Sequence, residues 1–512
     1  MQSFQKSKKL NITVVTALAL MLSACSNNSG NNEVNSNSAS PSTSTASSTA
    51  SSEPYEIVMA IPGTEQKDLG LVLGEANKVL KEKKINATLK IQIIPFSNYL
   101  QQLSLKASSG EKLDLMVTLG TFGYTTQAAN GWFAPLDDLI KQSGQDILSK
   151  VGQDYMNATK VKGVTYAIPT IHDLVQGQSF AMRKDLVDKY KIDVASIKKS
   201  SDLEKAFEVI KTNQPAISPA VPLAAGVSIA DGMQDFDPLG DKIGVMMDYD
   251  QLKVTNLYES AKYKELLTLI HKWYKAGYIL PDAATNQIAF SDLIKSGRAF
   301  GNFRVSTPGG AASDSRKTGT EMITVPVVQP VATTATATSV MLSISHNSQD
   351  KAKVMQFLNL LYTDKAFMNL LSWGIEGKHY IKKSENVITF PEGVNATNNG
   401  YYPNWNYMMG NEFLSYTFEG DNPDLWTAVD QYNKSAIKSK ALGFTYDSSP
   451  VSTEITAINN VINQYKMGLE TGTIDPEGKL PEFQSRLKAA GIDKVIAEKQ
   501  KQLDEWAKAN NK

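Results

Sequence analysis

The stretches YEIVMAIP (55–62), EQKDLGLVLGEANKVLKEKK (65–84) and ATLKIQIIPF (87–96) decide the fold. The first is a nearly continuous apolar run that ends at Pro62-Gly63, which is typical of a strand buried on both faces. The second has apolar residues at helical spacing, and the third again reads as a strand. A further helix pattern and the apolar run LDLMVTLG (113–120) follow. This alternation of strand and helix predicts an α/β fold with a parallel sheet and crossover helices.

Composition excludes several classes of protein. The 512 residues are enough for about two to four domains. Lys+Arg and Asp+Glu balance at 52 each, so the charge predicts no nucleic-acid partner. The chain has one cysteine, Cys25, which alone forms neither an internal disulfide, nor a CxxC pair, nor a thiolate zinc site.

The N-terminal residues have the layout of a secretory signal. Three lysines precede the apolar run LNITVVTALALML (10–22), which is too short to span a bilayer core of roughly 30 Å. LSAC (22–25) resembles the lipobox of bacterial lipoproteins, which implies cleavage before Cys25 and diacylglycerol on its sulfur. The alternative is an ordinary signal peptide with an incidental cysteine. We expect residues 1–24 to be the signal peptide and 25–53, rich in Ser, Asn and Thr, to be a disordered tether.

The rest of the chain has longer helical patterns. From about residue 179 helix patterns alternate with strand-like pieces, and strands are expected again within 322–346. Residues 348–374 predict a strong helical stretch. Two long amphipathic patterns, at 452–472 and 480–509, predict a helical C-terminus.

Several segments in this order resemble the extracellular solute-binding proteins, family 1, of ABC importers. They include GWFAPLDDLI (131–140), VKGVTYAIP (161–169), MRKDLVDKY (182–190) and SDLIKSGRAFGNF (291–303), and the resemblance continues from ITVPVV at 323 to HY at 380. The C-terminus resembles the domain of unknown function that closes LipO-type lipoproteins of Gram-positive bacteria.

The resemblance implies a two-lobed, periplasmic-binding-protein-like (type II) fold with an interlobe cleft and a helical C-terminal extension. Lobe 1 would comprise residues 54–176 and 305–372, and lobe 2 residues 177–304 and 373–440. The helical domain, residues 441–512, would pack on lobe 2. Ligands of open α/β sheets sit beyond the carboxyl ends of the strands, and two facing lobes can close around them by hinge bending.

The sequence lacks the common signatures of catalytic and metal sites. The chain contains no GxSxG, no GxxxxGK[ST] and no HExxH, and its four histidines are far apart in sequence. The acidic stretch DGMQDFDPLGD (231–241) could offer oxygens to Ca²⁺ but lacks the EF-hand spacing, so a solvated loop at the cleft rim is the preferred interpretation. We therefore expect no catalytic residues, no metal and no cofactor.

Loops at predicted strand ends combine aromatic rings with planar polar groups. Sugars present flat C–H patches beside hydroxyl groups, so they suit such a mixture. Core packing explains any single one of these residues as well as ligand contact does. The candidates for ligand binding are Thr121, Phe122, Tyr124, His172, Asp173, Asn302, Phe303, Arg304, Trp373, Glu376, His379, Tyr402 and Trp405.

The sequence thus favours a non-enzymatic, monomeric receptor. Its lipid anchor would hold it at the outer face of the cell membrane, and it would pass a small solute, for which an oligosaccharide is the expected class, to the permease of an ABC importer. One alternative is a surface-anchored polysaccharide-degrading enzyme. The other is a structural or signalling lipoprotein that has no ligand.

Overall fold

The computed structural model describes residues 53–512. Cys25, the signal peptide and nearly all of the predicted tether lie outside this part of the chain. Within residues 53–512, no helix combines the length and the apolar character that crossing a bilayer requires.

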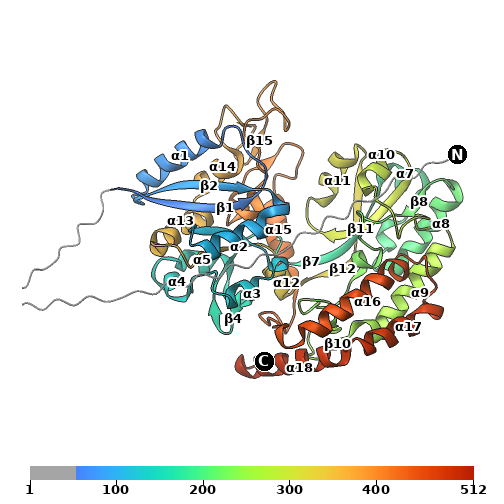
Figure 1. The fold of residues 1–512 in the computed structure, drawn as a ribbon. Helices are drawn as coiled ribbons and strands as arrows, with labels where there is room; N and C mark the ends of the chain where they lie inside the picture. The colour runs from blue at the N-terminus through green and yellow to red at the C-terminus, as the bar shows by residue number, and fades with distance from the viewer. Residues whose placement is uncertain (1–52) are drawn as a thin grey trace, which may run out of the picture. The chain divides into compact units, whose positions relative to one another are not determined.

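Lobe 1 is built on a five-stranded sheet in the order β2-β1-β3-β13-β6 (Figure 1). β1 and β2 are parallel over eight residue pairs, from Tyr55↔Ala87 to Pro62↔Ile94, as the opening stretch of sequence predicts. Six consecutive residues of β1 are buried because helices cover both faces of the sheet. The strands are β1 (Tyr55–Pro62), β2 (Ala87–Ile94), β3 (Leu115–Thr118), β6 (Ile168–Pro169) and β13 (Met341–Ile344).

Short helices and a small second sheet complete lobe 1. The helices are α1 (Leu69–Glu82), α2 (Tyr99–Ser109), α3 (Tyr124–Ala129), α4 (Asp137–Ser143), α5 (Gln145–Val151), α6 (Gln153–Ala158), α12 (Thr334–Ala337), α13 (Lys351–Thr363) and α14 (Lys365–Trp373). The remaining strands are the hairpin β4 (Lys160–Val161) and β5 (Val164–Thr165), and the sheet β14 (Ile381–Lys382), β15 (Val387–Thr389) and β16 (Thr417–Phe418). The helical stretch predicted over 348–374 is two helices, because the Asp364 side chain caps a new helix by accepting from the amide of Phe367.

Lobe 2 is built on a second five-stranded sheet in the order β17-β12-β7-β11-β8. β7 lies at its centre and is antiparallel to both of its neighbours, β11 and β12. The strands are β7 (Gln176–Arg183), β8 (Ser218–Ala220), β11 (Ala299–Ser306), β12 (Met322–Ala332) and β17 (Ile437–Lys438), and a separate pair joins β9 (Gly244–Val245) to β10 (Thr255–Asn256). The helices are α7 (Lys184–Tyr190), α8 (Glu204–Asn213), α9 (Ala261–Lys275), α10 (Phe290–Lys295) and α11 (Gly310–Thr318), with α15 (Leu425–Ser435) at the junction of the lobes.

Three C-terminal helices share a core with lobe 2. They are α16 (Ser452–Glu470), α17 (Pro476–Ala489) and α18 (Ile492–Ala509), so the second predicted amphipathic pattern is broken at Gly491, whose φ is +93°. Tyr263 and Leu267 of α9 are buried in one cluster with Ile458 of α16 and Phe483 of α17. Figure 1 shows these helices beside α9 and β10.

Two of the expected lobe boundaries need correction. Residues 305–332, expected in lobe 1, belong to lobe 2: they complete β11 and form α11 and β12, and β12 pairs with β7 from Met322↔Arg183 onward. Residues 373–409, expected in lobe 2, belong to lobe 1, where Tyr401, Trp405 and Met409 are fully buried in the core. Pairing and burial between residues far apart in sequence decide both points.

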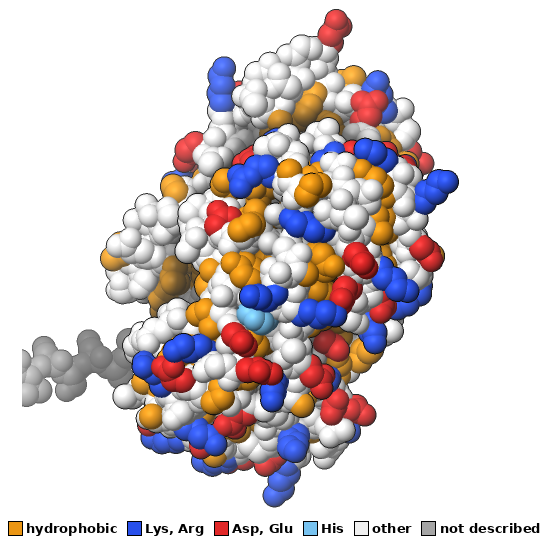
Figure 2. All heavy atoms as spheres, turned by 90° about the vertical axis from the view of Figure 1, so that its right-hand side faces the viewer, with side chains coloured by type: hydrophobic (Ala, Val, Ile, Leu, Met, Phe, Trp, Pro, Cys, Tyr) orange, Lys and Arg blue, Asp and Glu red, His pale blue; other side chains and the backbone are white. Residues whose placement is uncertain are grey.

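Charges of both signs are interspersed on the outer face of the molecule drawn in Figure 2. Apolar side chains lie between them in several areas of that face. This face therefore has no extended area of one charge sign, in keeping with the equal numbers of acidic and basic residues in the sequence.

Candidate functional site: two recesses between the lobes

The first recess lies between α11 of lobe 2 and the segments of lobe 1 next to the junction; we call it the α11 recess. Its volume is about 250 Å³. Its lining combines an indole ring, three carboxyl groups, two guanidinium groups and the start of a helix. The lining residues are Asp173, Arg304, Thr307, Pro308, Gly309, Gly310, Ser313, Arg316, Glu412, Asp421, Leu425, Trp426 and Val429.

Arg304 fixes α11 to the sheet of lobe 2. Its guanidinium donates to the carboxylate of Asp314, which is almost fully buried on α11, and to the carbonyl of Gly310 at 3.3 Å. A buried, charge-assisted pair of this kind holds geometry more firmly than an exposed one. The first turn of α11 is therefore held rigidly where it lines the recess.

One ion pair spans the recess. Arg316 on α11 donates to Asp421, which follows β16 of lobe 1, with 2.6 Å between Nη1 and Oδ1. About half of the Arg316 side chain is exposed, so the pair contributes little to stability. Its position across the lobes makes it a contact that can break and re-form.

Glu412 is the least satisfied charge of the α11 recess. Its carboxyl group accepts no hydrogen bond and forms no ion pair with any part of the chain that the structure describes, while its amide donates to Ile171 at 2.9 Å. Burial, with the nearby Asp173 carboxylate as a second cause, raises the pKa of Glu412 to about 8. Below that pH it is a neutral acid that can both donate and accept a hydrogen bond.

Trp426 supplies the aromatic wall of the α11 recess. The ring stacks on that of Phe413, with centroids 6.1 Å apart and an interplanar angle of 27°. Its Nε1 donates to the carbonyl of Ser415 at 2.6 Å, which fixes the orientation of the ring. An indole held in this way offers a flat apolar surface beside polar groups, which is what a sugar ring requires.

The second recess lies between α3 of lobe 1 and the loops of lobe 2 and the C-terminal domain; we call it the α3 recess. Its volume is about 280 Å³. It is rich in hydroxyl groups and also has several apolar and aromatic side chains. The lining residues are Gly120, Thr121, Tyr124, Thr125, Leu239, Gly240, Asp241, Thr334, Ala335, Thr338, Phe444, Thr445, Tyr446, Ser448 and Ile455.

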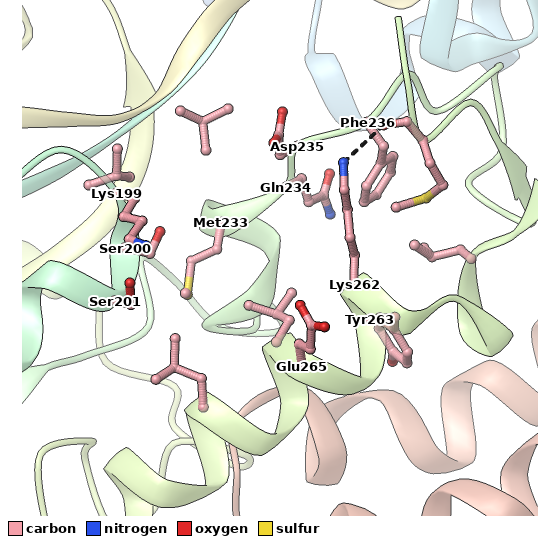
Figure 3. Close-up of a pocket in the computed structure, with 16 residues that line it drawn as sticks. Lys199, Ser200, Ser201, Met233, Gln234, Asp235, Phe236, Lys262, Tyr263 and Glu265 are labelled. Atoms are coloured by element: carbon pink, nitrogen blue, oxygen red, sulfur yellow. Dashed lines mark hydrogen bonds between the residues drawn. The ribbon is translucent and has the colours of Figure 1, made fainter. Parts of the chain in front are cut away.

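A third cavity, of about 390 Å³, lies within lobe 2 (Figure 3). Lys262 of α9 reaches across it and donates to the carbonyl of Met247 at 3.1 Å. None of the residues predicted to bind ligand lines it. Because its walls all come from lobe 2 and the elements packed on it, a movement of the lobes does not close this cavity.

Four of the thirteen predicted ligand residues line a recess between the lobes. Asp173 and Arg304 line the α11 recess, and Thr121 and Tyr124 line the α3 recess. His172 lies beside them at the junction: its ring contacts Asp173 at 2.7 Å and Ser339 at 3.3 Å, and it is nearly fully buried. His172 therefore joins two chain crossings.

The other eight candidates lie outside both recesses. Asn302 and Phe303 are buried in lobe 2, where the Phe303 ring stacks on Trp273 at 6.2 Å. Trp405 is fully buried in lobe 1, and the ring of His379 donates to Asp68 at 3.1 Å. The remaining four also have partners in lobe 1: Phe122 packs against Phe96, Trp373 against Tyr402, and Glu376 pairs with Lys382.

Sequence reasoning missed Glu412 and Trp426. Glu412 lies in a stretch, GNEF (410–413), that follows aromatic residues, but an acidic residue in a loop carries no distinguishing signal. Trp426 lies in an amphipathic helix, where an aromatic residue predicts core packing. Only the tertiary structure brings these two residues to Asp173.

With this geometry in place, comparison with known proteins identifies the class. The sequence model described as "Bacterial extracellular solute-binding protein" matches residues 72–366, and one described as a domain of unknown function, DUF3502, matches residues 440–508. The chain belongs to the bacterial extracellular solute-binding proteins.

Proteins of Streptococcus pneumoniae are similar to this chain over most of its length. The chain is similar to a carbohydrate ABC transporter substrate-binding protein of Streptococcus pneumoniae serotype 4 (strain ATCC BAA-334 / TIGR4), 31% identical over 502 residues, covering 96% of this chain and 97% of the relative. Its fold is similar to the N-glycan transport solute binding protein NgtS from Streptococcus pneumoniae, with a TM-score of 0.79, 30% identity, and coverage of 90% and 100%. The complex of NgtS with Man1GlcNAc gives a TM-score of 0.69 at 30% identity, and the comparison covers 88% of this chain and 99% of NgtS. The complex with Man5GlcNAc gives a TM-score of 0.65 at 30% identity, and the comparison covers 89% of this chain and 99% of NgtS.

Proposed function

We propose that this protein captures an oligosaccharide between its lobes by hinge closure and delivers it to the permease of an ABC importer. The single observation that carries this proposal is the α11 recess, which the Trp426 side chain lines together with Asp173 and Glu412. An aromatic face with several hydrogen-bonding groups is the chemistry that recognises sugars. The relative that binds Man1GlcNAc and Man5GlcNAc supports a glycan as the solute.

The junction of the lobes supports closure by a hinge. The chain crosses between the lobes after β6, after β12 and again between β16 and β17, with α15 in the last crossing. Two hydrogen bonds fix α15 at this junction: Asn433 donates to the carbonyl of His172, which follows β6, at 2.8 Å, and Tyr432 donates to that of Ser306, at the end of β11, at 2.8 Å. The TM-score is higher against the NgtS structure described without a glycan, at 0.79, than against the two glycan complexes, at 0.69 and 0.65. A change in lobe arrangement on glycan binding would produce such a difference.

Trp426→Ala tests the recess directly. Loss of a central aromatic contact costs about 2 kcal/mol, so the Kd for Man5GlcNAc should rise roughly thirtyfold in calorimetry. Trp426→Phe keeps a ring against Phe413 and should lose less affinity. If Trp426→Ala, folded by circular dichroism, binds Man5GlcNAc as the wild type does, the α11 recess does not hold the solute.

We also propose that the protein is anchored at the outer face of the membrane through lipid on Cys25. Two acyl chains give a stable anchor, whereas one gives only marginal binding. Cys25→Ser should move the protein from the membrane fraction to the medium, or leave it unprocessed, with its affinity for glycan unchanged. Retention of the mature-sized Cys25→Ser protein in the membrane fraction would contradict the anchor.

A non-enzymatic role is part of the proposal. Membership of a family of binding proteins supports it, and incubation of the protein with labelled Man5GlcNAc distinguishes it from the hydrolase alternative. We expect the glycan to be recovered intact. Release of shorter saccharides would instead favour a degrading enzyme.

A further inference from the structure

The C-terminal domain forms one wall of the α3 recess. Phe444, Tyr446 and Ile455 line it from residues 440–508, the region matched by a domain of unknown function. The opposite wall is Thr121 and Thr125 of lobe 1. Because α16 shares a core with α9, the C-terminal wall belongs with lobe 2. The recess therefore has walls on both bodies, and closure of the lobes changes its width.

Two buried polar atoms in the residues that line this recess have no partner. Tyr446 Oη and Asp241 Oδ2 make no hydrogen bond within residues 53–512, although both are shielded from solvent. An unpaired buried polar atom is costly, and most buried polar atoms in native proteins are paired. Two of them among the lining residues of one recess point to a partner that residues 53–512 do not supply.

The charge of Asp241 is already balanced. Its other oxygen accepts from Lys499 of α18, which is fully buried and also donates to the carbonyl of Gly244 at 3.1 Å. The Nζ of Lys499 lies 4.5 Å from the centre of the Tyr446 ring. The recess therefore offers hydrogen bonds without a free net charge, which favours a neutral ligand over an ion.

The remaining lining favours a polyhydroxylated ring. The hydroxyl groups of Thr121, Thr125 and Ser448 make no hydrogen bond to the described part of the chain, and they lie in the same recess as the Phe444 ring. A volume of about 280 Å³ is slightly below the roughly 300–1,000 Å³ of drug-sized pockets, and suits one or two sugar rings.

We propose that the α3 recess is a sugar subsite and that the C-terminal domain, through Tyr446 and Phe444, takes part in recognising the solute. This inference rests on the proposed function, because it requires the solute to be a glycan. It assigns to residues 440–508 a role in specificity. The ring of the glycan that enters the recess satisfies the hydroxyl group of Tyr446 when the lobes close.

The test compares two tryptophan variants on one short helix. Thr125 lines the recess, whereas its neighbour Thr126 is exposed and does not. Thr125→Trp should raise the Kd for Man5GlcNAc or Man1GlcNAc by about tenfold or more, because an indole fills the volume a sugar ring needs. Thr126→Trp should bind as the wild type does. Equal melting temperatures establish that both variants are folded.

Tyr446→Phe shows whether the hydroxyl group of Tyr446 recognises the glycan, because weak binding by Thr125→Trp alone could also come from an indole that blocks closure of the lobes. It removes one oxygen atom and adds no volume, and should raise the Kd by about three- to tenfold. The inference is overturned if Tyr446→Phe binds glycan with wild-type affinity, even when Thr125→Trp binds weakly. It is also overturned if Thr125→Trp and Thr126→Trp bind glycan equally well. A wild type that binds neither glycan overturns the proposed function and this inference together.

Discussion

At the scale of single residues, Glu412 shows how burial changes the chemistry of an ordinary side chain. It has no hydrogen-bonding partner for its carboxyl group in the described chain, and its pKa is raised to about 8 from the ordinary value of 4.5. The neutral acid is therefore the predominant form of Glu412 at neutral pH. Such a group can accept from one sugar hydroxyl and donate to another.

This raised pKa predicts a specific pH dependence of stability. Between pH 4.5 and about 8 the folded chain keeps a proton that the unfolded chain has released. The free energy of unfolding should therefore fall as pH rises through this window, by at most about 1.4 kcal/mol per pH unit from this group. Urea unfolding at pH 5, 7 and 8.5 should show a flatter profile for Glu412→Gln than for the wild type. Identical profiles would mean that Glu412 has an ordinary pKa.

At the scale of elements, α18 is fixed to lobe 2 by polar contacts as well as by packing. Lys499 is fully buried against Asp241, and burial lowers its pKa. The Gln500 side chain accepts from the amide of Val254 at 2.7 Å and donates to the carbonyl of Leu252 at 3.1 Å. These contacts set the position of the segment that lines the α3 recess, because Tyr446 packs on Lys499.

Lys499→Met should destabilise the protein by about 3–5 kcal/mol, because it leaves the carboxylate of Asp241 without its buried partner. The urea midpoint is the measurement. Lys501→Met is the matched control: Lys501 is two residues along the same helix but exposed, so its midpoint should shift little. Equal shifts in the two variants would show that the buried pair is not what holds α18.

At the scale of the whole molecule, the two five-stranded sheets form the centres of two lobes, which are joined where the chain crosses from one to the other. The proposed function depends on the difference in ligand affinity between open and closed arrangements of the lobes. The interlobe ion pairs Arg316–Asp421 and Lys438–Asp154 and the junction contacts of α15 are among the polar contacts that such a movement must preserve or exchange.

We therefore expect the molecule to become more compact when it binds glycan. Small-angle scattering of residues 53–512 should show a smaller radius of gyration with saturating Man5GlcNAc than without it. The folded Trp426→Ala variant, at the same glycan concentration, serves as the control with reduced occupancy. A scattering profile that does not change, although calorimetry shows saturation, would contradict the hinge.

The sequence predicted much of the fold but less of the site. The parallel β1–β2 pair follows from the apolar run at 55–62 and the helix pattern after it, since local periodicity carries that signal. The sequence could not show that Trp405 and Asp173 have different roles, because a residue in a predicted loop can be buried in the core or can line a cleft. One is fully buried in the core of lobe 1, and the other lines the α11 recess.

The sequence by itself determined the class of protein, the α/β alternation and the helical C-terminus, because these depend on local pattern and on the order of segments. Only the tertiary structure decided which side chains meet between the lobes. Asp173, Arg304, Glu412 and Trp426 come from segments separated by as many as 253 residues, counted from 173 to 426, and converge in one recess. Contacts at that separation depend on how the sheets and helices pack, which no local pattern records.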